Sequence, residues 1–188
     1  MERDSMFITN AWYMAAWANE ATTGVLARTL CNRPVVLFRD VATGKVAALD
    51  DRCCHRAAPL RFGTVISEGL ECGYHGMVFN SEGNCVRIPG QKTLPAKAKV
   101  KAYPVVEQDE IIWIWMGDPE LADTSKIVSY PYHNDHSQWP HKNQMYRVKA
   151  NYMLLVDNLM DLTHLAFVHK NTIGGNPKAH VEAKMTVT

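Results

Sequence analysis

The stretch Asp51-Arg52-Cys53-Cys54-His55, followed after sixteen intervening residues by Cys72-Gly73-Tyr74-His75, decides the fold of this chain. Cys53 and His55 form one pair of metal-binding side chains, and Cys72 and His75 form a second pair. Glycines, which allow a backbone to turn sharply or to approach another group closely, lie in or beside these pairs. They are Gly63, Gly69, Gly73 and Gly76. The pattern predicts two loops, each supplying one sulfur and one nitrogen ligand.

Two thiolates and two imidazoles are the ligands of a Rieske [2Fe–2S] cluster, in which the cysteines bind one iron and the histidines bind the other. A structural zinc site is the alternative, because Zn²⁺ accepts the same four donors. Zinc motifs usually separate paired ligands by two to four residues, whereas a single residue separates Cys53 from His55. The spacing therefore favours the cluster.

A second metal-binding pattern lies near the end of the sequence, where Asp161, His164 and His169 give Asp-x-x-His-x4-His. Two imidazoles and a carboxylate form the facial triad of non-haem Fe(II) oxygenases. On a regular helix His169 would lie about 140° from His164, so both reach one iron only if the helix bends or ends near His169. We expect Thr172-Ile173-Gly174-Gly175 to end the helix. Alternatively, these histidines are ordinary solvated helix residues.

The two patterns in this order resemble the oxygenase component of Rieske non-haem iron oxygenases. The resemblance rests on residues 10–13, 51–60, 72–76, 104–107, 113–119 and 157–164. The similar branch contains vanillate O-demethylase, dicamba monooxygenase and toluenesulfonate methyl-monooxygenase. Cys54 and the run Ile88-Pro89-Gly90-Gln91 are most similar to the toluenesulfonate type.

The resemblance implies two iron cofactors. The [2Fe–2S] cluster would be bound by Cys53, His55, Cys72 and His75. A mononuclear Fe(II) would be bound by His164 and His169, and its third ligand, an acidic residue, lies later in the family's longer sequences. We therefore expect a C-terminally truncated chain that binds its cluster but does not turn over substrate alone. Asp157 is an alternative third ligand, although solvent exposure suits it better.

The resemblance also implies an electron path between subunits of a homotrimer. By position, Asp161 would bridge the cluster ligand His75 of one subunit to the iron ligand His164 of the next. Asn158 would either support the iron site or pack the helix. The expected partners are a flavin and iron–sulfur reductase that uses NADH, O2 and a small aromatic substrate.

The expected reaction is hydroxylation or demethylation of a methyl or methoxy group on an aromatic acid by a two-component monooxygenase. A hydroxylated methoxy carbon collapses to a phenol and formaldehyde, so demethylation is a form of hydroxylation. The alternatives are a Rieske ferredoxin, which would carry electrons and have a vestigial tail, and a zinc-binding interaction module. Asp161, His164 and His169 favour the oxygenase, because an electron carrier needs no mononuclear site.

Short apolar runs separated by turns predict a mostly β, antiparallel fold. The expected hairpins pair residues 35–38 with 46–49, 77–80 with 84–88, and 105–107 with 111–115. We expect a Rieske domain over residues 1–119, a linker over 120–143, and the start of an incomplete α+β helix-grip-type catalytic domain over 144–188. Its first elements would be a strand over 144–151 and a helix over 152–165 that turns Leu155, Leu159 and Leu162 toward the core.

Several other residues have simpler expected roles. Cys31, Cys54 and Cys85 are interpreted as packed free thiols. Trp113 and Trp115 share a strand face and are expected in the core. Pro89-Gly90 is either a third loop over the cluster, as in the resembled family, or a plain turn. The linker histidines are interpreted as solvated residues rather than metal ligands; they are His133, His136 and His141.

Composition excludes some classes of function. The chain has 20 Lys and Arg against 19 Asp and Glu, a net charge of +1, so no basic surface for nucleic acid or anionic membrane is expected. No apolar run is long enough for a membrane span, and the charged start Met1-Glu2-Arg3-Asp4 precedes no signal-peptide core. Free thiols suit a reducing cytoplasm, which is the expected location.

Overall fold

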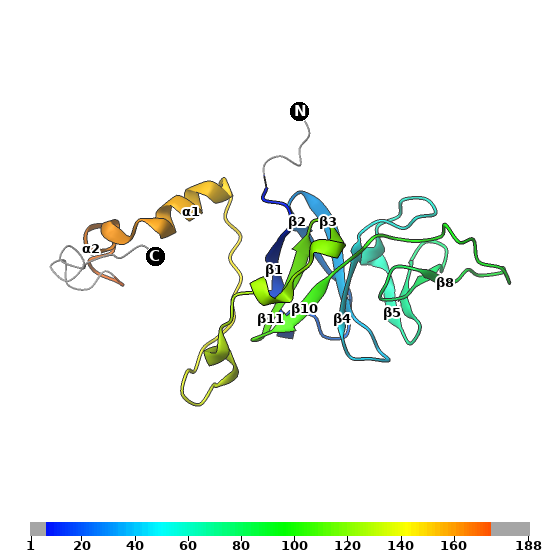
Figure 1. Cartoon of the computed structure of the whole chain (residues 1–188), viewed down its shortest axis with the longest axis horizontal. Coiled ribbons are helices and arrows are strands. Elements are labelled where there is room, and N and C mark those ends of the chain that lie inside the picture. The colour runs from blue at the N-terminus through cyan, green and yellow to red at the C-terminus, as the bar shows by residue number, and fades with distance from the viewer. Residues whose placement is uncertain (1–6, 174–188) are drawn as a thin grey trace. The chain divides into compact units, whose positions relative to one another are not determined.

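The structure is a computed structural model that describes residues 7–173, and it divides into two compact units between Asn143 and Gln144. The described part of the first unit contains three antiparallel sheets (Figure 1). The first sheet has the order β1 (Ala11–Trp17), β11 (Ile111–Met116), β10 (Val105–Gln108). The second has the order β2 (Leu26–Leu30), β3 (Arg33–Arg39), β4 (Val46–Asp50), β9 (Ala102–Tyr103). The third has the order β5 (Thr64–Ile66), β6 (Gly69–Glu71), β7 (Val78–Phe79), β8 (Cys85–Arg87).

The three predicted hairpins are confirmed. β3 pairs with β4, β7 with β8, and β10 with β11, all antiparallel. The mostly β, antiparallel fold is therefore also confirmed. The short 3₁₀ helices η2 (Ala18–Glu20) and η3 (Leu60–Phe62) connect strands, and η3 follows directly on the first cysteine loop.

The central strand β3 lies between two hydrophobic clusters. Four consecutive residues of this strand, Val35 to Phe38, are fully buried. Val36 and Phe38 belong to a cluster that also contains Cys53 and Cys72. The alternate residues belong to a second cluster with residues of β11. A strand covered on both faces is continuously apolar, and here it fixes the cysteine loops to the core of the unit.

The two tryptophans of β11 are buried, as predicted, with 9% of Trp113 and 1% of Trp115 exposed. Trp113 packs with Ile111 and Ile127, whereas the alternate isoleucines of the strand face the cluster shared with β3. This alternation is the two-residue period of a strand.

Residues 119–143, which also belong to the first unit, contact the first sheet through the turn between β10 and β11. They contain η4 (Pro119–Leu121), η5 (Thr124–Lys126) and η6 (Pro131–Asn134). The Asp109 carboxylate in that turn accepts hydrogen bonds from the Tyr130 N–H at 2.6 Å and from Asn134 Nδ2 at 2.8 Å. The segment predicted as a linker is thus tied to the sheet by side chains.

The described part of the second unit contains α1 (Tyr152–Met160), η7 (Leu162–His164) and α2 (Leu165–Val168). The predicted strand over residues 144–151 is wrong. All of these residues are exposed, and within the described part of the chain no strand pairs with them. A strand needs a neighbouring strand to form hydrogen bonds with its backbone N–H and C=O groups. An alternating pattern of apolar residues does not by itself supply that neighbour.

The predicted helix over residues 152–165 is interrupted at Asp161, whose backbone is extended. The Asp161 carboxylate accepts a hydrogen bond from the Thr163 backbone N–H and so caps η7. An aspartate carboxylate competes with the backbone carbonyl groups for N–H donors, which favours the end of one helix and the start of another. The predicted burial of the leucines is wrong, since Leu155, Leu159 and Leu162 are 44%, 69% and 49% exposed. Gly174 and Gly175 of the predicted stop signal lie outside the described residues. None of the helices in residues 7–173 is both long and apolar enough to cross a membrane.

Candidate metal centres

The two cysteine loops share one pattern of backbone hydrogen bonds. In the first, the Cys53 N–H donates to the Ala58 carbonyl at 2.9 Å, and the Ala57 N–H donates back to the Cys53 carbonyl at 3.0 Å. In the second, the backbone of Cys72 makes the same two bonds with the equivalent residues, at 2.8 and 2.9 Å. The fourth residue after each cysteine has a left-handed backbone, with φ 56° at Ala57 and 69° at Gly76. The two halves of the motif therefore form matched loops.

Each loop buries its sulfur and exposes its nitrogen ligand. Cys53 is 3% exposed and Cys72 is 2% exposed, whereas His55 and His75 are both exposed. The two imidazole rings meet edge to face, with their centroids 4.7 Å apart. The structure thus brings together all four predicted ligands, with a buried thiol side and an accessible imidazole side.

The glycines near the loops make room for protein backbone. A Cβ atom on Gly73 would lie 2.5 Å from the carbonyl oxygen of Phe62, which is too close for any side chain. At Gly76, a Cβ atom would lie 3.0 Å from the Pro89 ring, and the backbone is left-handed. The sequence predicted sharp turns, or a close approach to the sulfide of the cluster, at these glycines. The structure shows close approaches to neighbouring segments of the protein.

An ion pair between the buried Asp51 and the exposed Arg61 holds the first loop to η3. The Asp51 side chain is 1% exposed, and its carboxylate contacts Arg61 Nε at 2.6 Å. It also accepts a hydrogen bond from the Arg61 backbone N–H at 2.8 Å. Sequence reasoning missed this pair, although Asp51 lies two residues before a ligand. Asp51 holds the loop through its contacts with Arg61, ten residues later, and sequence spacing does not reveal such contacts.

A third segment lies beside the two histidines. His55 and His75 line a pocket of about 590 Å³ together with Ile88, Pro89 and Gln91. The Pro89 ring is also the group that would contact a Cβ atom on Gly76. These contacts favour the interpretation of Pro89-Gly90 as a third loop at the cluster site over that of an unconnected turn.

The environment of the thiols fits a cationic metal group. Burial raises the pKa of the Cys53 thiol to about 11, against the lowering effect of a hydrogen bond from the His55 backbone. The neighbouring Cys72 thiol raises it further. Two adjacent buried thiols ionise only when a positive charge compensates them, as bound iron does. The four donors present are those that a Rieske cluster requires.

Of the remaining cysteines, Cys85 is buried and Cys31 is half-buried, as predicted for packed thiols. Cys54 is exposed, so the prediction that it is packed is wrong. It directly follows the buried Cys53 in a tight loop, where successive side chains point in different directions. None of the five cysteines forms a disulfide.

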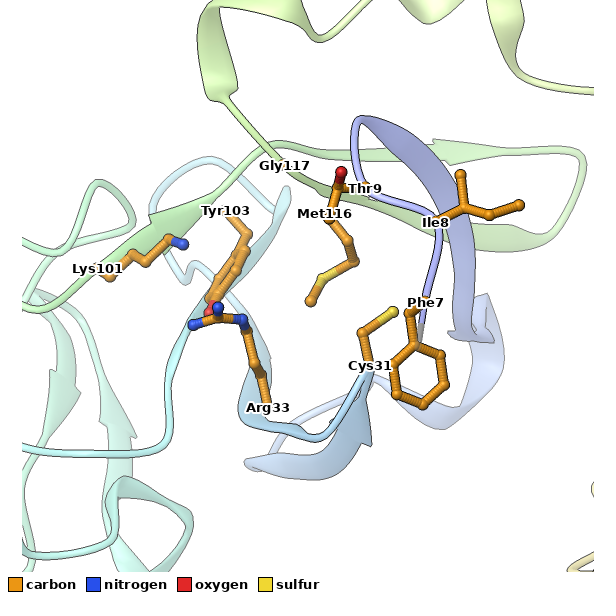
Figure 2. Close-up of a pocket in the computed structure, with 9 residues that line it drawn as sticks. All are labelled: Phe7, Ile8, Thr9, Cys31, Arg33, Lys101, Tyr103, Met116 and Gly117. Atoms are coloured by element: carbon orange, nitrogen blue, oxygen red, sulfur yellow. The ribbon is translucent and has the colours of Figure 1, made fainter. Parts of the chain in front are cut away.

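A smaller pocket of about 190 Å³ contains Cys31 and no predicted site residue. Figure 2 shows Cys31 of the β2–β3 turn and Arg33 at the start of β3 extending toward Tyr103 and Met116. Burial raises the pKa of the Cys31 thiol, which disfavours the reactive thiolate. The Tyr103 hydroxyl is already used, since it donates to Asp50 Oδ1 at 2.5 Å.

In the second unit, the break at Asp161 brings two histidines together. His164 and His169 are half-buried, and their ring centroids lie 5.5 Å apart. α2 ends at Val168 and His169 caps it, so the condition under which both histidines can reach one iron, a helix that ends near His169, is met. His164 Nδ1 lies 2.6 Å from the Asp161 carbonyl oxygen, so Nδ1 carries the proton and Nε2 keeps its lone pair.

Asn158 and Asp157 differ in their relation to these histidines. Asn158 Nδ2 lies 3.4 Å from His164 Nε2. Within the described residues, Asp157 forms no group with His164 and His169 in which three ligand atoms lie within 4.8 Å. The described geometry therefore supplies two imidazoles and an amide, and it does not support Asp157 as a substitute ligand.

Comparison with known protein families agrees with both halves of this arrangement. The model of the Rieske [2Fe–2S] domain matches residues 11–104, which include all four predicted ligands. The model of the vanillate O-demethylase oxygenase C-terminal domain matches residues 148–188. The chain therefore belongs to the family of Rieske [2Fe–2S] proteins.

Characterised relatives narrow the branch. The iron–sulfur subunit of a toluene-4-sulfonate monooxygenase system from Comamonas testosteroni is 49% identical over 178 residues, covering 94% of this chain and 51% of that protein. The oxygenase component of dicamba O-demethylase from Stenotrophomonas maltophilia is 44% identical over 170 residues, covering 87% and 48%. A crystal structure of dicamba monooxygenase bound to dicamba superposes with a TM-score of 0.77 at 43% identity, covering 87% and 49%. The chain spans about half the length of these relatives.

The Asp51–Arg61 pair gives a prediction about the stability of the first loop. Arg61→Met would leave the buried Asp51 carboxylate without its cation, at a cost of roughly 1–3 kcal/mol. We expect a lower midpoint in chemical unfolding and faster loss of bound iron. Arg56→Met removes an exposed arginine of the same loop and is the matched control. Equal midpoints for the two variants would contradict the role given to the pair.

Proposed function

We propose that this chain is part of the oxygenase component of a Rieske aromatic monooxygenase that works with a separate reductase. The observation that carries the proposal is the pair of matched loops, which bury two thiols and expose two imidazoles. When bound, the cluster would supply one-electron transfer, and a mononuclear Fe(II) at the second unit would supply activation of O2.

Each residue of the first unit has a specific part in this proposal. Cys53 and Cys72 would hold the inner iron among apolar side chains, away from water. His55 and His75 would hold the outer iron at the surface, where a partner can approach within electron-transfer distance. The pocket beside them, which is lined in part by Ile88 and Pro89, offers a mixed surface for that approach.

In the second unit, His164 and His169 would hold the mononuclear iron. The contact from His164 Nδ1 to the Asp161 carbonyl orients the ring and leaves Nε2 free to bind metal. Asn158 Nδ2, which lies 3.4 Å from Nε2, would hold the imidazole in place until iron binds. The third ligand, an acidic residue, stays a prediction.

Asp161 is suited to link two subunits. Its Oδ1 accepts from the Thr163 N–H at 3.0 Å and from the Thr163 hydroxyl at 2.6 Å. The hydrogen bonds from Thr163 lower the pKa of the Asp161 carboxyl, so it is ionised at neutral pH. Within the described residues, Oδ2 has no hydrogen-bond partner, and it could accept an N–H from His75 of the next subunit in a homotrimer.

The names of the relatives support a substrate class. They refer to toluene-4-sulfonate, vanillate and dicamba, which are small aromatic acids bearing a methyl or methoxy group. We infer that the substrate here is of this class and that the reaction hydroxylates or demethylates that group. The reductase would be a flavin and iron–sulfur protein that uses NADH.

An electron carrier is the second candidate, because two exposed imidazoles would serve a soluble carrier equally well. A carrier needs neither His164 nor Asp161. The effect of Asp161 variants on electron flow therefore separates the two functions.

Variants of the loops test the cluster assignment. Cys53→Ser and His75→Ala each remove a proposed ligand, and we expect both to abolish the visible absorption of the cluster. Cys54→Ser changes the exposed neighbour of Cys53 and should leave the spectrum intact. The measurement is the absorption spectrum of anaerobically purified protein. An unchanged spectrum in Cys53→Ser would refute the assignment, and a colourless wild-type protein that contains zinc would favour the zinc module.

Asp161→Asn tests the electron path. Asparagine retains an oxygen that can cap η7 but lacks the charge, so the fold and the cluster spectrum should be unchanged. The assay uses Fe(II), O2, an aromatic acid and an oxygenase chain that includes the predicted acidic third ligand, and we expect reoxidation of the reduced cluster to slow by about 10- to 100-fold. Asp157→Asn, in the helix turn before, is the matched control and should reoxidise at the wild-type rate. Equal rates in the two variants would favour the electron carrier.

A further inference from the structure

Residues 136–143 of the first unit bring two histidines onto a carboxylate of the β10–β11 turn. His136 Nε2 lies 2.5 Å from Glu110 Oε1, and His141 Nε2 lies 3.3 Å from Glu110 Oε2. The imidazoles are nearly parallel, with an interplanar angle of 17° and centroids 4.6 Å apart. Within the described residues, this is the one group of three His, Cys, Asp or Glu side chains whose ligand atoms lie within 4.8 Å of one another.

We propose that Glu110, His136 and His141 form a further metal site, which binds a divalent transition cation such as Zn²⁺. The site is separate from both iron centres and shares no ligand with them. Its function would be structural: it would clamp the segment that precedes Gln144 in the sequence onto the end of the sheet. The interpretation of His136 and His141 as merely solvated is thereby replaced.

The spacing of the three ligand atoms suits one small ion. Zn²⁺ binds histidine nitrogen and carboxylate oxygen at roughly 2.0–2.2 Å, so tetrahedral ligand atoms lie roughly 3.4 Å apart. The contact between His141 and Glu110 is already near that separation. The contact between His136 and Glu110 is shorter and would open slightly around an ion.

The proton on His141 gives a second argument. His141 Nδ1 lies 2.9 Å from the Trp139 carbonyl oxygen, which only accepts hydrogen bonds, so Nδ1 carries a proton. In the neutral ring, Nε2 then directs a lone pair at the Glu110 carboxylate. Two acceptors face each other stably only with a cation or a second proton between them. A histidine whose Nδ1–H is held by a backbone carbonyl is also typical of metal ligands.

Asn143 supplies a further unsatisfied group. Its Nδ2 donates to Glu110 Oε2 at 3.3 Å, while its Oδ1 is buried without a hydrogen-bond partner in the described structure. A buried acceptor without a partner costs about 1–3 kcal/mol. Asn143 lines the same pocket as the three proposed ligands, so a metal-bound water could reach its oxygen. Lys142 also lines this pocket and opposes a cation, which argues for moderate affinity.

The conformation of the turn gives Glu110 an unusual position. Asp109 and Glu110 both have left-handed backbones, with φ 54° and 62°. Such hairpin turns favour glycine at the second position, and another residue there costs about 1–2 kcal/mol. A glycine at position 110 would have no side chain, whereas the Glu110 carboxylate contacts both histidines.

The donor set selects the class of metal. Two imidazoles and one carboxylate, without sulfur, suit Zn²⁺ and similar transition ions. Mg²⁺ and Ca²⁺ prefer all-oxygen sites. The test therefore uses Zn²⁺, with Mg²⁺ as the comparison ion.

The experiment is a calorimetric titration of Zn²⁺ into the cluster-containing protein that carries His164→Ala and His169→Ala, so that the proposed iron site does not compete. We expect one saturable site for Zn²⁺ and none for Mg²⁺. His136→Phe, His141→Phe and Glu110→Gln should each weaken binding by at least about 100-fold, more than loss of an outer-shell contact does. The visible spectrum is followed throughout to show that zinc does not displace the cluster.

His133→Phe is the matched control. The His133 ring stacks on Tyr130, and phenylalanine keeps that packing. His133 is not one of the three proposed ligands, so this variant should bind Zn²⁺ as tightly as the parent. Absence of saturable binding would overturn the proposal, and so would equal binding by the His136→Phe and His133→Phe variants.

Discussion

The backbone hydrogen bonds that close the two cysteine loops are the constraint on which the rest of the structure depends. Each cysteine donates its N–H to a carbonyl five residues later and accepts from the residue before that one. This arrangement turns each thiol toward the apolar cluster under β3 and leaves each histidine at the surface. A metal group held there would have a dry side bound by sulfur and an accessible side bound by nitrogen.

The surrounding sheets serve to hold these loops rigid. β3 is covered on both faces, and its inner residues pack in the same cluster as Cys53 and Cys72. The Asp51–Arg61 ion pair and the close contact of Gly73 with Phe62 fix the loops from the side. In the β10–β11 turn, the two acidic residues Asp109 and Glu110 hold residues 129–143. Two separate parts of the unit thus rely on carboxylates that bridge segments distant in sequence.

Features of the fold that depend on local sequence patterns could be predicted from the sequence. Cysteine and histidine spacing predicted four cluster ligands, which the structure places in two matched loops. Apolar runs with turn residues correctly predicted three hairpins. It failed where partners decide the outcome: residues 144–151 alternate like a strand but have no described neighbour, and Leu155 and Leu159 have no described surface to cover. The contact of Glu110 with His136 and His141 joins residues at least 26 positions apart, which no spacing rule reveals. The division into a Rieske domain ending at residue 119 and a linker stays a prediction.

The most direct test of the account is the content of iron and acid-labile sulfide in the chain purified without oxygen. A Rieske cluster held by the two loops predicts two sulfides per chain, with two irons that the loops retain during gel filtration. Zinc with no sulfide would contradict the account, because the four ligands would then hold a single d¹⁰ ion instead of a redox cluster.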